Sequence, residues 1–182
     1  QIMTTSPASR VDAEPEPEDM AHIICASGPT TVRPRGSMLS HRSLTAEAAI
    51  SAVAFQQTDK DVALLFALPM YHAFGLVLIM LTSIFAGSTV VMLPGLSISS
   101  LWEVIEKERG TMFMGVPYVY ALMVNMAEGV KNNLSSLRLC GSSGAPLSID
   151  IIQRFKQCYG LDIVQLYGST TSTGAVTCQP LD

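Results

Sequence analysis

The chain has 182 residues, of which 48% are hydrophobic and 14% are charged, and its formal net charge is −4. This length favours one compact domain with a real core over two full domains. The acidic balance argues against general nucleic-acid binding, which needs a concentrated basic face. The apolar run 74–86 is too short to span a bilayer, which takes ~20 residues.

The four cysteines, Cys25, Cys140, Cys158 and Cys178, lie far apart, and no two of them form a Cys-x-x-Cys pair. This spacing indicates neither a zinc site nor a disulfide framework. Free thiols suit a reducing compartment and no signal peptide is visible, so we predict a cytoplasmic location.

The charged fraction of 14% is low for a soluble domain, which suggests that neighbouring protein covers much of the surface. The sequence starts at Gln1 and stops at Asp182, soon after a motif, so both ends look cut. We therefore expect a part of a longer protein, and the exposed face predicts self-association.

In chain order, residues 1–19 come first and are predicted to form a flexible acidic lead-in, because they contain little apolar clustering. Over 20–182, short β-rich apolar runs alternate with longer helical ones, the pattern of an α/β domain. The predicted strands are 21–25, 62–67, 89–93, 111–114, 137–140 and 163–166. The predicted helices are 44–55, 75–86, 99–109, 117–127 and 149–159. Strands that read as continuous apolar runs favour a mostly parallel sheet with helices on both faces.

Four polar loops each follow a predicted strand, and they are 26–36, 68–75, 141–146 and 167–174. Ligands of parallel α/β sheets bind beyond the carboxyl ends of the strands. We therefore expect the four loops to gather at one mouth.

The loop 26–36 combines hydroxyl groups, glycines and guanidinium groups. Hydroxyls and backbone N–H groups donate to phosphate oxygens, and arginine offers a bidentate charged fork, so the loop is predicted to hold phosphate. No Gly-Lys-Ser/Thr follows Gly28 at the spacing of a P-loop, and a kinase or GTPase function therefore has little support.

This loop resembles the phosphate loop of the AMP-forming acyl-CoA synthetases, the adenylate-forming ligases, whose pattern is Ser-Ser-Gly-Thr-Thr-Gly-x-Pro-Lys-Gly. The matching residues are Ser27, Thr30, Thr31, Pro34 and Gly36, with Arg35 for the family lysine. Gly28, Pro29 and Val32 depart from the pattern. Pro29 removes a possible N–H donor, and a β-branched residue at a position of positive φ costs about 1–2 kcal/mol.

Three later segments resemble further motifs of the same family, in the family's order. His72 lies in a Leu-Pro-x-x-His-x-x-Gly segment, which lines the carboxylic-acid pocket in the family. The segment 144–147 reads Gly-Ala-Pro-Leu and resembles the backbone that lines the adenine pocket, and 167–170 resembles the Tyr-Gly-x-Thr motif that contacts adenine and phosphate.

Each of these segments also has a plainer interpretation. A single histidine is more often a structural residue, and 141–146 serves equally well as a strand-to-helix connection. The segment 167–171 alone resembles a Ser/Thr-rich surface turn. His22 and His41 have no motif around them and are interpreted as structural or solvent-facing.

The resemblance covers most of 20–180 and is nearest to the fatty-acyl and coumarate ligase branch. It implies one subdomain of an enzyme that uses ATP to activate a carboxylic acid as acyl-AMP and then transfers the acyl group to coenzyme A. It gives catalytic roles to His72 and Thr170. It assigns ATP or AMP binding to Ser27, Thr30, Thr31, Arg35, Gly36, Gly144, Ala145, Pro146, Tyr167, Gly168 and Thr170.

Mg²⁺ belongs to the family's chemistry, but Thr171 stands where the family has a metal-binding glutamate. A neutral hydroxyl weakens a magnesium site, which usually relies on carboxylates, so we predict no metal residues. We expect the chain alone to be inactive, because the family's ribose aspartate and C-terminal domain would lie beyond Asp182. Two alternatives stay open: a non-catalytic nucleotide- or acyl-binding pseudoenzyme, and a purely structural fragment.

Overall fold

The computed structural model describes residues 13–26, 35–93, 95, 97–127 and 133–181. Its main sheet has six strands in the order β4-β3-β5-β6-β7-β8. The strands are β3 (Val62–Leu65), β4 (Thr89–Met92), β5 (Met112–Gly115), β6 (Leu139–Ser142), β7 (Ile163–Ser169) and β8 (Gly174–Cys178). All neighbours pair in parallel except β7 and β8, which are antiparallel. The predicted α/β class with a mostly parallel sheet is confirmed.

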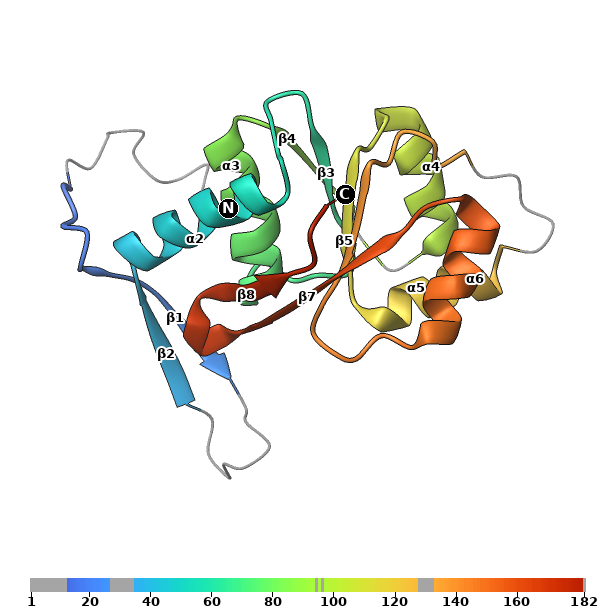
Figure 1. Ribbon diagram of the computed structural model, residues 1–182. Coiled ribbons are helices and arrows are strands. Elements are labelled where there is room, and N and C mark those ends of the chain that lie inside the picture. Colours follow the sequence, from blue (N-terminus) through green and yellow to red (C-terminus); the bar gives the residue numbers. More distant parts are fainter. Residues whose placement is uncertain (1–12, 27–34, 94, 96, 128–132, 182) are drawn as a thin grey trace.

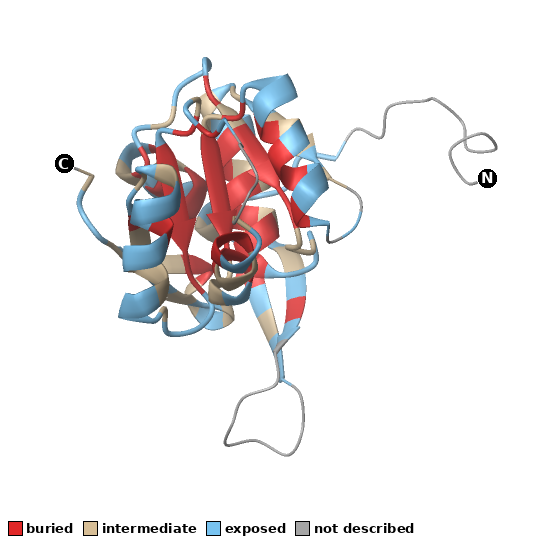
Figure 2. Ribbon diagram, turned by 90° about the vertical axis from the view of Figure 1, so that its right-hand side faces the viewer, coloured by how far each residue is buried: buried red, intermediate tan, exposed pale blue. Residues whose placement is uncertain are grey.

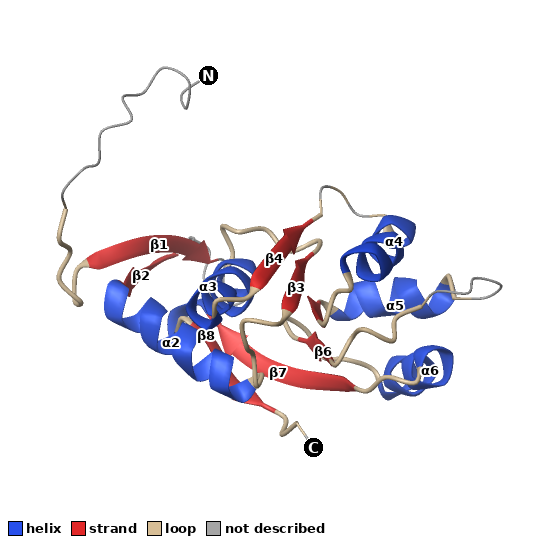
Figure 3. Cartoon of the chain, turned by 90° about the horizontal axis from the view of Figure 1, so that it is seen from above, coloured by secondary structure: helices blue, strands red, loops and turns tan. Residues whose placement is uncertain are grey.

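Helices cover both faces of this sheet (Figures 1 and 3). One layer holds α4 (Ile98–Glu108), α5 (Pro117–Asn125) and α6 (Ile149–Tyr159). The other holds α2 (His41–Ala54), the π-helix η1 (Phe74–Leu81) and its continuation α3 (Thr82–Ala86). The sheet thus forms the middle layer of a three-layer sandwich.

Alternating side chains of the central strands supply two hydrophobic cores. Leu64 and Phe113 pack with the layer that contains α4 to α6, whereas Ala63 and Met112 pack with Phe74 and its layer. Figure 2 shows the buried strands between helices whose outer faces are exposed. Period-two alternation with apolar residues on both sides is the pattern of a sheet that is buried on both faces.

The predicted strand 21–25 exists as β1 (Met20–Ala26), but it lies outside the main sheet, which corrects its expected place. It pairs antiparallel with β2 (Arg35–Ser40), which the sequence analysis missed. One side of this ribbon, with Ile24 and Leu39, is buried against η1. The hairpin therefore holds the ends of the predicted phosphate loop beside the helical layer.

Two other differences lie near the predicted mouth. The strand β8 was not expected, and its pairing with β7 extends β7 to Ser169, beyond the predicted end. The predicted helix 75–86 begins as a π-helix, and the Thr82 hydroxyl donates to the carbonyl of Val77 five residues back, at 2.8 Å.

Residues 1–12 of the predicted lead-in lie outside the described residues. The backbone N–H of Arg42 donates to the carbonyl of Pro17 at 2.7 Å, and Arg42 pairs with Glu18.

Within the described ranges, no helix combines the length and apolarity that crossing a membrane requires.

Candidate functional site

Three of the four predicted loops meet at the carboxyl ends of the parallel strands. They line a cavity of 470 Å³, to which His72 comes from the loop before η1, Ser143 and Gly144 from the end of β6, and Thr170 and Thr171 from the turn after β7. Phe74 and Leu78 of η1 supply an apolar wall. The sequence therefore brings together a histidine, hydroxyl groups and exposed backbone at the edge where such sheets bind ligands.

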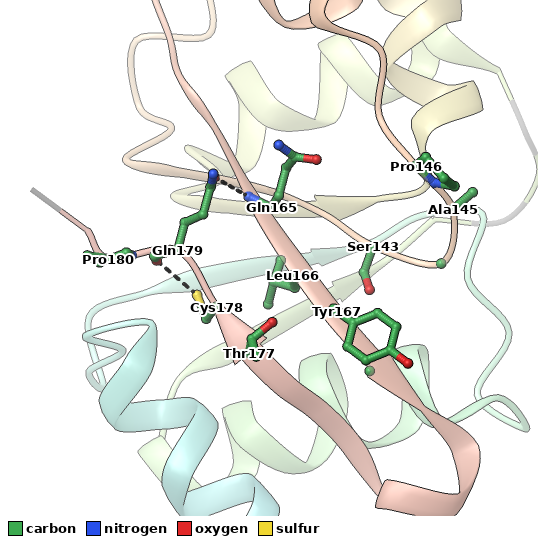
Figure 4. Close-up of a pocket in the computed structure, with 12 residues that line it drawn as sticks. Ser143, Ala145, Pro146, Gln165, Leu166, Tyr167, Thr177, Cys178, Gln179 and Pro180 are labelled. Atoms are coloured by element: carbon green, nitrogen blue, oxygen red, sulfur yellow. Dashed lines mark hydrogen bonds between the residues drawn. The ribbon is translucent and has the colours of Figure 1, made fainter.

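A second cavity of 740 Å³, drawn in Figure 4, shares lining residues with the first. Its lining includes Gly144, Ala145 and Pro146 from the loop after β6 and Tyr167 from β7. Tyr167 is 68% exposed, so its ring is available to stack on a planar group. Both cavities share Ser143, Gly144 and Gly168, and one elongated ligand passing these residues can occupy both.

The loop 26–36 is described only at its two ends. Ser27, Thr30 and Thr31 lie outside the described residues. Arg35 and Gly36 are the first residues of β2, where Arg35 pairs with Ala26. The strand β2 contacts the 3-10 helix η2 (Thr170–Ser172), and this places the exposed Arg35 on the strand that reaches the Thr170 turn.

Gly168 occupies the most confined glycine position of the site. A Cβ atom there would lie 2.0 Å from the carbonyl oxygen of Gly174 and 2.8 Å from Cα of Ala175. Both are backbone atoms of β8, so no side-chain rotation relieves the clash. Glycine is therefore required for β8 to approach β7 at the cavity wall.

Gly144 is required for a different reason. Its φ of 89° lies in the left-handed region, which side chains disfavour. The turn that it makes exposes the backbone of 144–146 to the larger cavity.

The Thr170 turn is held by its own hydroxyl groups. Ser169 and Ser172 form a capping box, in which the Ser169 Oγ accepts from the backbone N–H of Ser172 at 3.2 Å and the Ser172 Oγ accepts from that of Ser169 at 3.1 Å. The Thr171 Oγ1 lies 3.1 Å from the Ser169 Oγ. These bonds fix η2 and leave Thr170 and Thr171 on the wall of the smaller cavity.

These residues do not by themselves make a magnesium site. No cluster of three His, Cys, Asp or Glu side chains suited to a metal occurs in the described part of the chain. Thr171 brings a neutral hydroxyl to the turn, where Mg²⁺ favours carboxylate oxygen.

His72 is exposed at the mouth of the smaller cavity. Its Nδ1 accepts a hydrogen bond from the backbone N–H of Phe74 at 3.1 Å. In a neutral ring the proton then resides on Nε2, and this atom can donate to an anionic group.

Sequence reasoning missed the part of the larger cavity that β8 supplies. Thr177, Cys178 and Gln179 line it together with Gln165 of β7, and the Gln179 side chain accepts from the backbone N–H of Gln165 at 2.8 Å (Figure 4). Burial raises the pKa of the Cys178 thiol, so this cysteine is a poor nucleophile. Only the long-range pairing of β8 with β7 reveals these residues.

Comparison with known proteins decides the family. The family model described as "AMP-binding enzyme" matches residues 3–182. The chain belongs to the AMP-binding enzyme family. The resemblance drawn from the four loops is thereby confirmed.

Two curated relatives indicate the breadth of this similarity. The chain is 38% identical to 4-coumarate–CoA ligase-like 9 of Arabidopsis thaliana over 86% of its own length and 28% of the relative's. It is 30% identical to a long-chain-fatty-acid–CoA ligase of Bacillus subtilis, over 84% of its length and 28% of the relative's. The AMP-binding chain thus spans less than a third of either relative.

Solved structures share the fold. ATP-bound MatB from Rhodopseudomonas palustris matches with a TM-score of 0.87 and 27% identity, over 98% of this chain and 35% of that one. The inhibitor-bound N-terminal domain of FACL13 from Mycobacterium tuberculosis matches with a TM-score of 0.88 and 25% identity, over 98% and 44%. The AMP-binding fold of these structures is thus present in nearly all of the chain.

Proposed function

We propose that the chain is the nucleotide- and acid-binding part of an ATP-dependent acid–thiol ligase that acts on a fatty or aryl carboxylic acid. The observation that supports this most strongly is the pair of adjoining cavities that share Gly144 and Gly168. The larger cavity has an exposed aromatic ring and open backbone, and these features favour the binding of a nucleotide base. The smaller cavity has an apolar wall beside a histidine and hydroxyl groups. These features favour the binding of the carboxyl end of an apolar acid.

The proposed reaction has two steps. A carboxylate oxygen of the acid bonds to the α-phosphorus of ATP, the bond to the bridging oxygen breaks, and pyrophosphate leaves. The sulfur of coenzyme A then bonds to the acyl carbon and its proton passes to solvent, while the bond from the acyl carbon to the phosphate oxygen breaks and AMP leaves. We expect this second step to need the rest of a longer protein, and the chain alone to be inactive.

The described residues would act mainly by positioning. Tyr167 would stack on adenine while the backbone of 144–146 lines its edge. Thr170 would donate to the α-phosphate, and Nε2–H of His72, which lines the same cavity, would orient the acid. Ser27, Thr30, Thr31, Arg35 and Gly36 are proposed to hold the remaining phosphates.

Titration with acyl-adenylate mimics tests this proposal. Sulfamoyl adenosines that carry a coumaroyl or a fatty-acyl chain should bind at least about tenfold more tightly than AMP, because only they fill both cavities. Calorimetry of the wild-type chain measures each affinity, and Tyr167→Ala should weaken AMP and the mimics alike. Equal affinity for AMP and both mimics would show that the smaller cavity takes no acid.

A second candidate function is a non-catalytic nucleotide or acyl binder. The observation that favours it is Thr171, a neutral residue bonded to Ser169 in the turn that would face the metal. Thr171→Glu should strengthen ATP binding in Mg²⁺ by about tenfold and leave binding in EDTA unchanged or weaker, which calorimetry in both buffers measures. Thr171→Gln is the matched neutral control. A wild-type chain that already binds ATP more tightly in Mg²⁺ would argue against this candidate.

Cytoplasmic location and self-association also remain proposals. Apolar side chains are exposed on the outer faces of α2 and α3, and they are Ile50 (64%), Val53 (79%), Ile84 (66%) and Phe85 (55%). Such surface supports association with further protein.

A further inference from the structure

Glu47 is a buried acid beside the candidate site that none of the motifs includes. It lies on α2 and is only 8% exposed. Its Oε1 accepts a hydrogen bond from the backbone N–H of Ala175 at 2.8 Å and another from the Ser51 hydroxyl at 3.1 Å. Burial raises the pKa of Glu47. Burying a polar group costs free energy of folding unless its hydrogen bonds are made.

The β7–β8 turn is shaped to receive this carboxyl group. A Cβ atom on Gly174 would lie 2.8 Å from Oε1 and 2.9 Å from Cγ of Glu47, so the glycine gives the acid room. Thr173, just before it, is buried with a φ of 72°, a strained conformation for a residue with a side chain. The turn adopts this conformation next to Ala175, whose backbone N–H donates to the Glu47 carboxyl group.

The hydrogen bond joins α2, which follows the β1–β2 hairpin, to β8, which follows the Thr170 turn. On one side, α2 follows β2 directly, and its N-cap Ser40 accepts from the backbone N–H of Ser43 at 3.2 Å. On the other side, Ala175 comes just after the turn with Thr170, and Gly174 lines the 470 Å³ cavity. Glu47 and Ala175 are 128 residues apart in the sequence.

We propose that Glu47 is a positioning residue that fixes the Thr170 turn relative to the β1–β2 hairpin and so sets the phosphate-binding part of the site. This inference rests on the proposed nucleotide binding. Glu47 makes no contact with the larger cavity, whose lining comes from 143–146, 165–168 and 177–180. Its loss should therefore affect phosphate groups and spare the base.

The experiment titrates ATP and adenosine separately into wild type, Glu47→Ala, Glu47→Gln and the matched control Ser51→Ala, with thermal unfolding measured in parallel. Glu47→Ala should weaken ATP about tenfold, as loss of a hydrogen bond to a carboxyl group implies, and leave adenosine unchanged. Glu47→Gln keeps an acceptor for the Ala175 N–H and should restore ATP affinity. Ser51→Ala keeps the bond to Ala175 and should bind like wild type.

The results that would contradict the role of Glu47 differ from those that would contradict nucleotide binding. Equal losses of ATP and adenosine affinity, no loss at all, or a Glu47→Gln variant as weak as Glu47→Ala would overturn the role of Glu47 while nucleotide binding stands. A wild-type chain that is folded and binds neither ligand would overturn the proposed function, and the role of Glu47 with it. If Glu47→Ala does not fold, Glu47→Asp, too short to reach Ala175, should show the same selective loss.

Discussion

Gly168→Ala is expected to abolish ATP binding and to lower the free energy of unfolding by about 1–3 kcal/mol, the usual cost of overpacking. The added methyl group would meet the carbonyl oxygen of Gly174 at 2.0 Å and Cα of Ala175 at 2.8 Å. The strands β7 and β8 must then separate, and because Gly168 lines both cavities, both lose their shape. Calorimetric titration and denaturant unfolding measure the two effects.

Val176→Ala is the control for this prediction, since it changes β8 at a side chain that is 58% exposed. It should bind ATP like wild type and unfold at a similar denaturant concentration. A Gly168→Ala variant with unaltered affinity and stability would mean that the close approach of β7 and β8 is not needed.

Asp61→Asn is expected to lower the free energy of unfolding by about 2–3 kcal/mol, because it removes the charge of a buried carboxylate that is hydrogen-bonded to the partly exposed Arg138 guanidinium. The Asp61 carboxylate accepts from Nε of Arg138 at 2.7 Å and from Nη2 at 2.8 Å. It also accepts from the Thr111 hydroxyl at 2.7 Å and the backbone N–H of Thr58 at 2.8 Å. Asp61 precedes β3 and Arg138 precedes β6, so the pair joins the amino ends of the strands, opposite the site.

The same carboxylate predicts a pH dependence. Burial alone would raise the pKa of Asp61, but the hydrogen bonds from Arg138, Thr111 and Thr58 outweigh it and lower the pKa from 3.8 to about 2. The charged form is thus favoured in the folded state, so this stabilisation is present above pH 3.8 and is lost as the pH falls towards about 2. Unfolding of wild type and Asp61→Asn across this range should show the two curves converging at low pH.

Asp162→Asn gives the matched control, because Asp162 pairs with Lys156 at 2.8 Å on the surface, with both side chains more than 60% exposed. Exposed pairs contribute about 0–1 kcal/mol, so the control should change little. If Asp61→Asn were as mild as Asp162→Asn, the Asp61–Arg138 pair would not stabilise the sheet.

Most of the fold and part of the site could be predicted from the sequence. The five parallel strands of the main sheet and the helices were visible because their apolar periodicity is local, and the motif around Tyr167 and Gly168 was visible because its residues are adjacent. The strand β8 was not, since it has only five residues, begins with Gly174 and has its short apolar run interrupted by Thr177. Its place depends on pairing with β7.

The remaining site features depend on contacts between distant segments. Glu47 carries no motif, and only the folded chain brings it to Ala175. The strand β2 could not be predicted because it pairs only with β1 and not with any strand of the main sheet. Ser27, Thr30 and Thr31 lie outside the described residues, and their roles rest on the family pattern.

Calorimetric titration of ATP into the folded wild-type chain tests the central claim most directly, because the loops at the mouth jointly predict nucleotide affinity. We predict saturable binding of one ATP per chain, competed by AMP and lost in Gly168→Ala. A chain that is shown to be folded and gives no binding heat at millimolar ATP would contradict the account, and would leave family membership without a working nucleotide site.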